Sequence, residues 1–171
     1  MYDLELLLIG GSASDPLYGL VKSLGIRHFG RLAHDELPLF YSAADLYLAP
    51  AFAGTWVPFG GLSTAIIEAL ACNIPVVTKQ LIHFPTDEWS KVGLIPKDKN
   101  DVVNCISQIF ENPSAYANCR EVARKYYDLA GIMNRTIMIY DNLFEQYYGG
   151  TCNMRNYAES CSIMDRNQID M

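Results

Sequence analysis

The sequence predicts an α/β protein built on a doubly wound parallel sheet. Short apolar segments alternate along the chain with segments that carry helix start and stop signals. This alternation is typical of parallel strands joined by helices that cover both faces of the sheet. The chain has 171 residues, of which 50% are hydrophobic and 19% charged, so it can bury the core of one ordinary domain.

Five short apolar segments are predicted to be the strands. They are Leu4–Ile9, Ile26–Phe29, Leu46–Ala49, Pro75–Val77 and Val92–Ile95. Parallel sheets of this kind bind ligands outside the carboxyl ends of their strands. The loops that follow the first four strands are therefore the candidate positions for a site.

Polar caps and Gly or Asn stops delimit the predicted helices. Asp15 and Asp35 are the expected N-caps, and Gly25, Asn73 and Gly131 are the expected stops. The predicted helices are Pro16–Leu24, Asp35–Ala43, Ser63–Cys72, Asp101–Glu111 and Pro113–Leu129.

The segment after Gly131 is predicted to form a last, amphipathic helix. Its apolar face recurs at helical spacing through Met133, Ile137, Tyr140, Phe144 and Tyr147. We expect this aromatic stripe to pack into the core. The domain is predicted to cover residues 1–148, and residues 149–171, which lack periodicity, are expected to be a disordered tail.

Charge and composition exclude several classes of protein. A formal net charge of −6 argues against a nucleic-acid partner, which would need a basic stripe. No apolar run approaches the roughly 18 residues that span a bilayer, and the acidic start does not resemble a signal peptide. The five cysteines form no CxxC pair and no zinc-ligand spacing, as expected for a cytoplasmic protein without a metal or other cofactor.

The segment that ends at Val77 carries the most chemistry. Its helix follows a turn whose N–H groups suit a phosphate, formed by Gly60, Gly61, Leu62, Ser63 and Thr64. Within the helix, Glu68 is the only charged residue among Ala, Ile and Leu, one turn beyond Thr64 on the same face. A carboxylate there can accept two hydroxyl protons from a ribose diol, although a solvated Glu68 is at least as good an interpretation.

Two segments resemble the C-terminal domain of retaining glycosyltransferase family 4, also called group 1. They are Ser42–Pro50, which reads SAADLYLAP, and Glu68–Val77, which reads EALACNIPVV. Weaker similarities join them at Gly30-Arg31-Leu32 with Glu36, Leu37 and Tyr41, and at Val92–Pro96. The resemblance covers about residues 4–148.

The resemblance implies the Rossmann-like, donor-binding half of a two-domain (GT-B) glycosyltransferase. Such an enzyme transfers the sugar of a nucleotide-sugar to a glycan or lipid-linked acceptor with retention, without a metal and without an enzyme nucleophile. By position in the family pattern, Glu68 would bind the donor ribose. The backbone around Gly30, Arg31 and Leu32 would bind the base. The turn Gly61–Thr64 would meet the diphosphate and the sugar.

Three departures from the family pattern bear on activity. The first Glu of the family's Glu–seven residues–Glu motif falls on Gly60, which puts donor choice or activity in doubt. The long loop Pro50–Leu62 carries three aromatic residues, which could stack on a base or sugar but more often pack as a hydrophobic lid or interdomain contact. The first βα unit, with its central strand and its Arg and Lys for the diphosphate, is expected to be missing, as is the acceptor domain. The strands Leu4–Ile9 and Leu46–Ala49 should then flank a gap or pair directly.

No catalytic residue is identifiable in this chain, and the isolated chain is expected to be inactive. Lys79 is the best substitute cation for the diphosphate, although a solvated Lys is the commoner outcome. His28, His34 and His83 are interpreted as structural or solvated. The acceptor half would lie in cis or on a partner subunit and could bring peripheral membrane association.

Two other functions stay open. A nucleotide-sugar 2-epimerase on the same fold would carry its carboxylates and a His in both halves. A non-catalytic nucleotide-sugar-binding or scaffolding subunit of a glycan-assembly complex would agree better with the missing motif Glu and the missing Arg and Lys.

Overall fold

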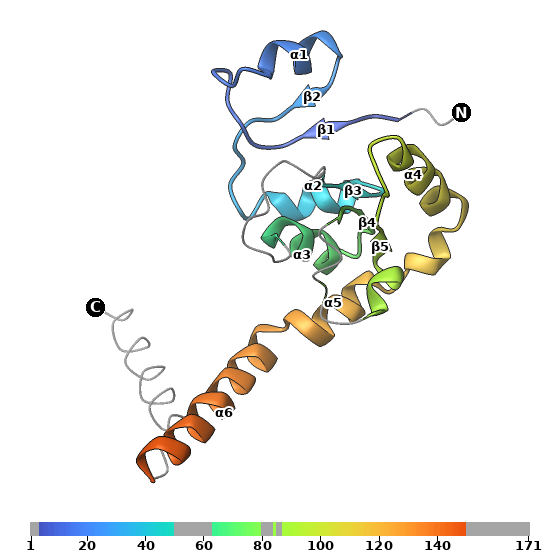
Figure 1. Cartoon of the computed structure of the whole chain (residues 1–171). Coiled ribbons are helices and arrows are strands. Elements are labelled where there is room, and N and C mark those ends of the chain that lie inside the picture. Colours follow the sequence, from blue (N-terminus) through green and yellow to red (C-terminus); the bar gives the residue numbers. More distant parts are fainter. Residues whose placement is uncertain (1–3, 50–62, 80–83, 85–86, 150–171) are drawn as a thin grey trace. The chain divides into compact units, whose positions relative to one another are not determined.

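The computed structural model describes residues 4–49, 63–79, 84 and 87–149 (Figure 1). The chain divides into two compact units, Met1–Arg120 and Glu121–Met171. Several sequence predictions lie outside the described residues: the turn residues Gly60, Gly61 and Leu62, the aromatic residues of the long loop, His83, and the tail from residue 150 onward.

All strand pairings in the described residues are parallel, as the fold class requires. The strands are β1 (Leu7–Leu8), β2 (Arg27–His28), β3 (Tyr47–Leu48), β4 (Val76–Val77) and β5 (Gly93–Leu94). β1 pairs with β2 in one sheet, and a second sheet has the order β3–β4–β5. Each strand lies within its predicted segment but is shorter. Direct pairing of the first and third strands, one of the two expected outcomes, is not found among these residues.

Helices separate and follow the strands, as predicted. They are α1 (Tyr18–Ser23), α2 (Leu37–Ala43), α3 (Thr64–Ala71), α4 (Asp101–Glu111), α5 (Cys119–Tyr127) and α6 (Leu129–Tyr148). Two 3₁₀ turns, η2 (Asp87–Lys91) and η3 (Pro113–Tyr116), precede β5 and α5. The structure confirms Asn73 as the stop after α3, with a left-handed φ of 67°. Gly149, which follows α6, is also left-handed, with φ of 65°.

Both predicted N-caps of the first two helices are wrong. α1 has Leu17 at its N-cap, and Asp15 instead accepts the Leu17 N–H at 2.9 Å in the turn before the helix. α2 has Glu36 at its N-cap, and Glu36 accepts the Ala33 N–H at 2.8 Å. In both cases an acidic side chain stabilises the preceding turn, and the helix begins after that turn.

Gly131 does not stop a helix. It lies in the first turn of α6, and its N–H donates to Oδ2 of the N-cap residue Asp128 at 2.9 Å. The break between the last two helices therefore falls at the Asp128 cap, because a capping carboxylate starts a new helix there.

The buried core of the first unit surrounds β4. α3 and α4 both contact β4. The largest fully buried side chains include Ile66, Leu70, Val76, Val77, Val92 and Ile109. By contrast, the described residues 4–49 include no buried side chain. The apolar pattern of Leu4–Ile9 is typical of a buried strand, but Leu4, Leu6 and Leu8 are 57%, 50% and 41% exposed. Within the described residues, β1 pairs with β2 alone.

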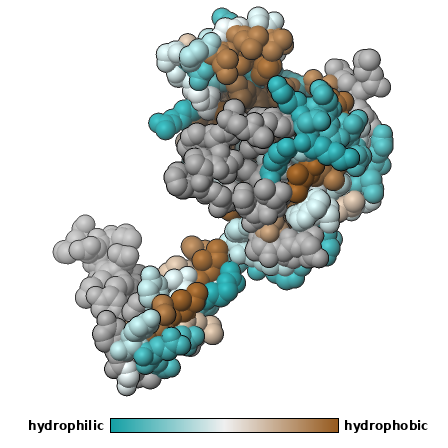
Figure 2. Space-filling view, viewed as in Figure 1, coloured by the Kyte–Doolittle hydropathy of each residue, from teal (hydrophilic) through white to brown (hydrophobic). Residues whose placement is uncertain are grey.

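The aromatic stripe of α6 is also not in a core. Met133, Tyr140 and Tyr147 are 51%, 56% and 78% exposed. Besides α6, the described part of the second unit contains residues 121–127 of α5, a short stretch that offers little surface to cover a 20-residue helix. Figure 2 shows hydrophobic side chains on the surface of α6 and around α1.

Candidate functional site

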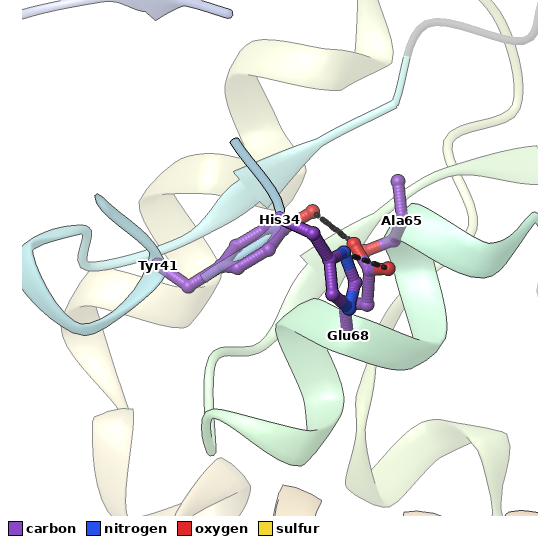
Figure 3. A network of polar contacts seen from close by, with 4 residues as sticks. All are labelled: His34, Tyr41, Ala65 and Glu68. Atoms are coloured by element: carbon purple, nitrogen blue, oxygen red, sulfur yellow. Dashed lines mark hydrogen bonds and ion pairs between the residues drawn. The ribbon is translucent and has the colours of Figure 1, made fainter. Parts of the chain in front are cut away.

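Glu68 is held at the edge of the buried face of α3. Its helix neighbours Ile66, Ala69 and Leu70 are fully buried, whereas the Glu68 side chain is 25% exposed. The Tyr41 hydroxyl, from α2, donates to Glu68 Oε2 at 3.2 Å (Figure 3). The carboxylate is therefore neither buried without a partner nor freely solvated.

The second carboxylate oxygen of Glu68 faces an imidazole. Nδ1 of His34 lies 3.8 Å from Glu68 Oε1, and the His34 side chain is 84% exposed (Figure 3). His34 follows the turn at Gly30, so the structure brings the predicted base-binding segment close to Glu68. The sequence interpretation of His34 as solvated holds, but its position beside Glu68 was not foreseen.

Both the hydroxyl and the ring of Tyr41 contact neighbouring residues. The hydroxyl also lies 3.3 Å from the backbone carbonyl oxygen of Ala65, one turn before Glu68, so its single proton is shared between the two acceptors. Its ring meets the Tyr47 ring edge-on, with centroids 5.9 Å apart. Burial raises the pKa of the Tyr41 phenol well above its ordinary value, and the neighbouring Tyr47 and Glu68 raise it further. Tyr41 therefore remains a hydrogen-bond donor at neutral pH.

The helix that carries Glu68 begins where the sequence predicted. Ser63 occupies the N-cap with an extended backbone (φ −68°, ψ 149°), and its carbonyl accepts the Ile66 N–H at 3.0 Å. Thr64, the first residue of α3, is exposed. The start of α3 is thus open to a ligand at Thr64, and Glu68 lies one turn further along the helix.

The other described residues of the predicted site are Gly30, Arg31, Leu32 and Lys79. Gly30 has φ of 64°, and its carbonyl accepts the Gly10 N–H at 2.6 Å, which ties the turn after β2 to the loop after β1. Arg31 is exposed and Leu32 half-buried. Lys79 follows β4 and is half-buried, and it forms no ion pair with Glu68. The structure thus joins Glu68 to the segment after Gly30 through His34.

A separate hollow of about 270 Å³ lies at the carboxyl end of β1. It is lined mainly by the loop after β1 and by α1, and Glu68 is not among its lining residues. His28 forms part of its wall, with Nε2 2.6 Å from the Gly10 carbonyl and its ring edge-on to Tyr18. This geometry agrees with the prediction of a structural role for His28.

Neither a metal centre nor a membrane span is found in the described residues. Those residues contain no group of three or more His, Cys, Asp or Glu side chains that could hold a metal ion. Within the described ranges, no helix combines the length and the apolar character needed to cross a membrane.

Two proteins of known structure share this fold. Sucrose-phosphate synthase from Thermosynechococcus elongatus superimposes with a TM-score of 0.64 at 27% identity, over 83% of this chain and 39% of that chain. Anabaena HepE in complex with UDP gives a TM-score of 0.62 at 18% identity, over 81% of this chain and 41% of that one, and a HepE complex with UDP-glucose gives 0.61. The fold is therefore the Rossmann-like half of a GT-B glycosyltransferase.

The chain belongs to the family Glycosyl transferases group 1, which matches residues 1–126. Among curated proteins, it is 31% identical over 105 residues to O-antigen chain mannosyltransferase B from Escherichia coli. That match covers 59% of this chain and 26% of the mannosyltransferase. The chain thus corresponds to about a quarter of that relative and about two fifths of the solved structures.

Proposed function

We propose that this chain binds the donor nucleotide-sugar of a retaining, metal-independent glycosyltransferase. The family membership and the fold support the class of reaction. One observation supports the position of the binding site, namely the arrangement of the Glu68 carboxylate. Its Oε2 accepts a hydrogen bond from Tyr41, and its Oε1 lies near the exposed side chain of His34.

In this proposal, Glu68 accepts hydrogen bonds from the ribose hydroxyls of the donor. The backbone around Gly30, Arg31 and Leu32 meets the base, and the position of His34, 3.8 Å from Glu68, supports this because His34 lies two residues after Leu32. The start of α3 at Ser63 and Thr64, together with the turn Gly60–Leu62, meets the diphosphate and the sugar, because the positive end of the helix dipole attracts anions. Lys79 contributes a cation to the diphosphate.

The acceptor is held by a second domain, in cis or on a partner subunit, which also accounts for any peripheral membrane association. Sugar transfer proceeds to a glycan or lipid-linked acceptor with the donor phosphate assisting and without an enzyme nucleophile. The setting is the cytoplasm. This chain's own part is to hold and orient the donor, a contribution that can supply a large share of the rate.

Titration calorimetry of the full chain with UDP, GDP and ADP tests the binding site. Glu68→Ala should weaken the tightest of these nucleotides by about ten- to a hundredfold, as for a lost charged hydrogen-bond acceptor. Glu111→Ala removes an exposed carboxylate from the end of α4 and is the matched control. Equal affinity of the parent and Glu68→Ala would remove Glu68 from the site.

One observation favours a second candidate function. Position 60, where the family motif has a Glu that contacts the transferring sugar, is Gly. A chain without that carboxylate can bind the nucleotide and still fail to act on the sugar. A non-catalytic nucleotide-sugar-binding subunit would then bind the free nucleoside diphosphate and the nucleotide-sugar equally well, whereas a transferase subunit would gain affinity from the sugar.

A further inference from the structure

We propose that Tyr41 is a positioning residue that orients the Glu68 carboxylate and so sets the preference for a ligand with a ribose diol. This inference rests on the proposed function, because it assumes that Glu68 is the ribose acceptor. It concerns a different residue, on a different helix, whose effect can be measured separately.

The hydroxyl of Tyr41 joins Glu68 to a fixed point of the backbone. It lies 3.2 Å from Glu68 Oε2 and 3.3 Å from the carbonyl oxygen of Ala65, on the same helix (Figure 3). A carboxylate on a flexible side chain can otherwise rotate and exchange its two oxygens. The Tyr41 hydroxyl, kept in place by the Ala65 carbonyl, favours the Glu68 rotamer that brings Oε2 within hydrogen-bond reach of it.

The ring of Tyr41 is itself held in place. It is half-buried and packs edge-on against Tyr47 at a centroid distance of 5.9 Å. Its raised pKa keeps the phenol protonated, so the group donates and the carboxylate accepts. Tyr41 therefore defines Oε2 as the oxygen committed to the protein.

The other oxygen, Oε1, remains for a ligand. Nδ1 of His34 lies 3.8 Å from Oε1, which is beyond ordinary hydrogen-bond length. The His34 side chain is 84% exposed, so it can turn away into solvent. A diol that approaches from that side binds an acceptor whose rotamer is already fixed, and less conformational entropy is lost on binding.

The experiment compares a ribonucleotide with its 2′,3′-dideoxy analogue on the full chain. The tightest binder among UDP, GDP and ADP and its dideoxy form are titrated into the parent, Tyr41→Phe, Glu68→Ala and the double variant. Tyr41→Phe should weaken the ribonucleotide by about three- to tenfold, the range for one hydrogen bond, and leave the dideoxy analogue unchanged. In the Glu68→Ala background the same substitution should have no effect on either ligand.

Tyr47→Phe is the matched control. Like Tyr41→Phe, it removes a tyrosine hydroxyl, but from the ring that packs on Tyr41. The affinities of this variant for both ligands should equal those of the parent. Thermal melts of every variant establish that it is folded.

The outcomes separate this inference from the proposed function. A large effect of Glu68→Ala without any effect of Tyr41→Phe would overturn the positioning role alone. Equal weakening of both ligands by Tyr41→Phe would also overturn it, because the hydroxyl would then support the fold and not the diol. Failure of the parent to bind any of the three nucleotides, or to prefer the ribose form, would overturn both.

Discussion

Gly93 in β5 lies directly against the backbone of Val76 in β4. A β-carbon placed on Gly93 would come within 1.9 Å of the Val76 carbonyl oxygen and 2.9 Å of its Cγ2. The two residues are register partners in the parallel pair of strands. Because the contact is with backbone in the centre of the core, no rotamer change can relieve it.

We therefore expect Gly93→Ala to lower the free energy of unfolding by about 2–3 kcal/mol, as for an overpacked core position. Urea denaturation followed by circular dichroism measures the change. Gly19→Ala is the control, since no atom lies within 4 Å of its β-carbon position and Ala favours the α1 helix. A Gly93→Ala variant as stable as the parent would mean that β4 and β5 are further apart than described.

Asn73 joins the end of α3 to the start of α5. It adopts φ of 67°, its Nδ2 donates to the Ala117 carbonyl at 2.9 Å, and its Oδ1 accepts the Arg120 N–H at 3.0 Å. Asn73→Gly keeps the backbone conformation but loses both hydrogen bonds, and should cost about 1 kcal/mol of unfolding free energy. Asn73→Ala should cost about 1 kcal/mol more, because a side chain with a β-carbon is strained at positive φ.

The same urea experiment ranks the three proteins. The order parent, Gly variant, Ala variant is expected. If the Gly variant matched the parent, the two side-chain hydrogen bonds would contribute nothing. If the Ala variant matched the Gly variant, the left-handed conformation of residue 73 would carry no cost.

Cys119 should make the protein less stable in alkali. Its side chain is fully buried, and burial raises the pKa of the thiol to about 12. In the unfolded chain a thiol has a pKa of about 8.5. The stabilising contribution of the neutral thiol is therefore complete below about pH 8.5 and is lost as the pH rises toward the folded value.

Between those limits the parent should lose up to about 1.4 kcal/mol of unfolding free energy per pH unit on account of Cys119. In the Cys119→Ala variant, the unfolding free energy should fall less steeply with pH by that amount, although the variant is less stable than the parent at neutral pH. Urea denaturation between about pH 8 and pH 11 compares the slopes. Cys72→Ala, which removes a half-exposed thiol, is the matched control. Parallel slopes for the parent and Cys119→Ala would contradict the burial of Cys119.

The sequence predicted the second half of the first unit better than its N-terminal part. The bounds of α4 match the prediction, and Asn73 has the left-handed conformation, because local signals decide both features. The N-cap of α1 lies two residues later than predicted and that of α2 one residue later, since the side chains of Asp15 and Glu36 bind turns that precede the helices.

The candidate site shows the limit of local patterns. Glu68 could be selected because it is the only charge in an apolar helix. Its partners could not, since Tyr41 and His34 lie 27 and 34 positions away and reach it only through the packing of α2 beside α3. Tyr41 did belong to the stretch that resembles the family, but nothing in its sequence context assigned it a partner. The exposed stripe on α6 was wrongly assigned to the core, because periodicity shows which residues share a face and not what covers that face.

The full 171-residue chain should transfer no sugar by itself. Placement of two reactants against each other can contribute about 7–11 kcal/mol, and the proposed function assigns the acceptor to a second domain or a partner subunit. Incubation with radiolabelled UDP-glucose or GDP-mannose and a lipid or glycan acceptor should yield neither a glycoside nor free nucleotide. Formation of a glycoside would contradict the proposal, and nucleotide release without any acceptor would favour a 2-epimerase.

The edges of β1 and β3 should make the protein self-associate. In the described residues β1 pairs only with β2, and β3 only with β4, so each strand has one edge without a ladder partner. Leu4, Leu6 and Leu8 are at least 41% exposed beside the β1 edge. Unpaired backbone groups flanked by apolar side chains favour pairing with another chain. We expect the weight-average mass in sedimentation velocity to rise with concentration.

A charge at the edge should suppress this association, since an exposed Lys on an edge strand disfavours pairing with another chain. Leu8→Lys places the charge within β1 itself and should shift the protein toward monomer. Leu24→Lys is the matched control, because Leu24 is 64% exposed at the end of α1 and lies outside any strand. If both variants lower the weight-average mass equally, exposed apolar side chains in general, and not the β1 edge, drive the association. A parent that stays monomeric over micromolar to millimolar concentrations would mean that neither edge is available for pairing.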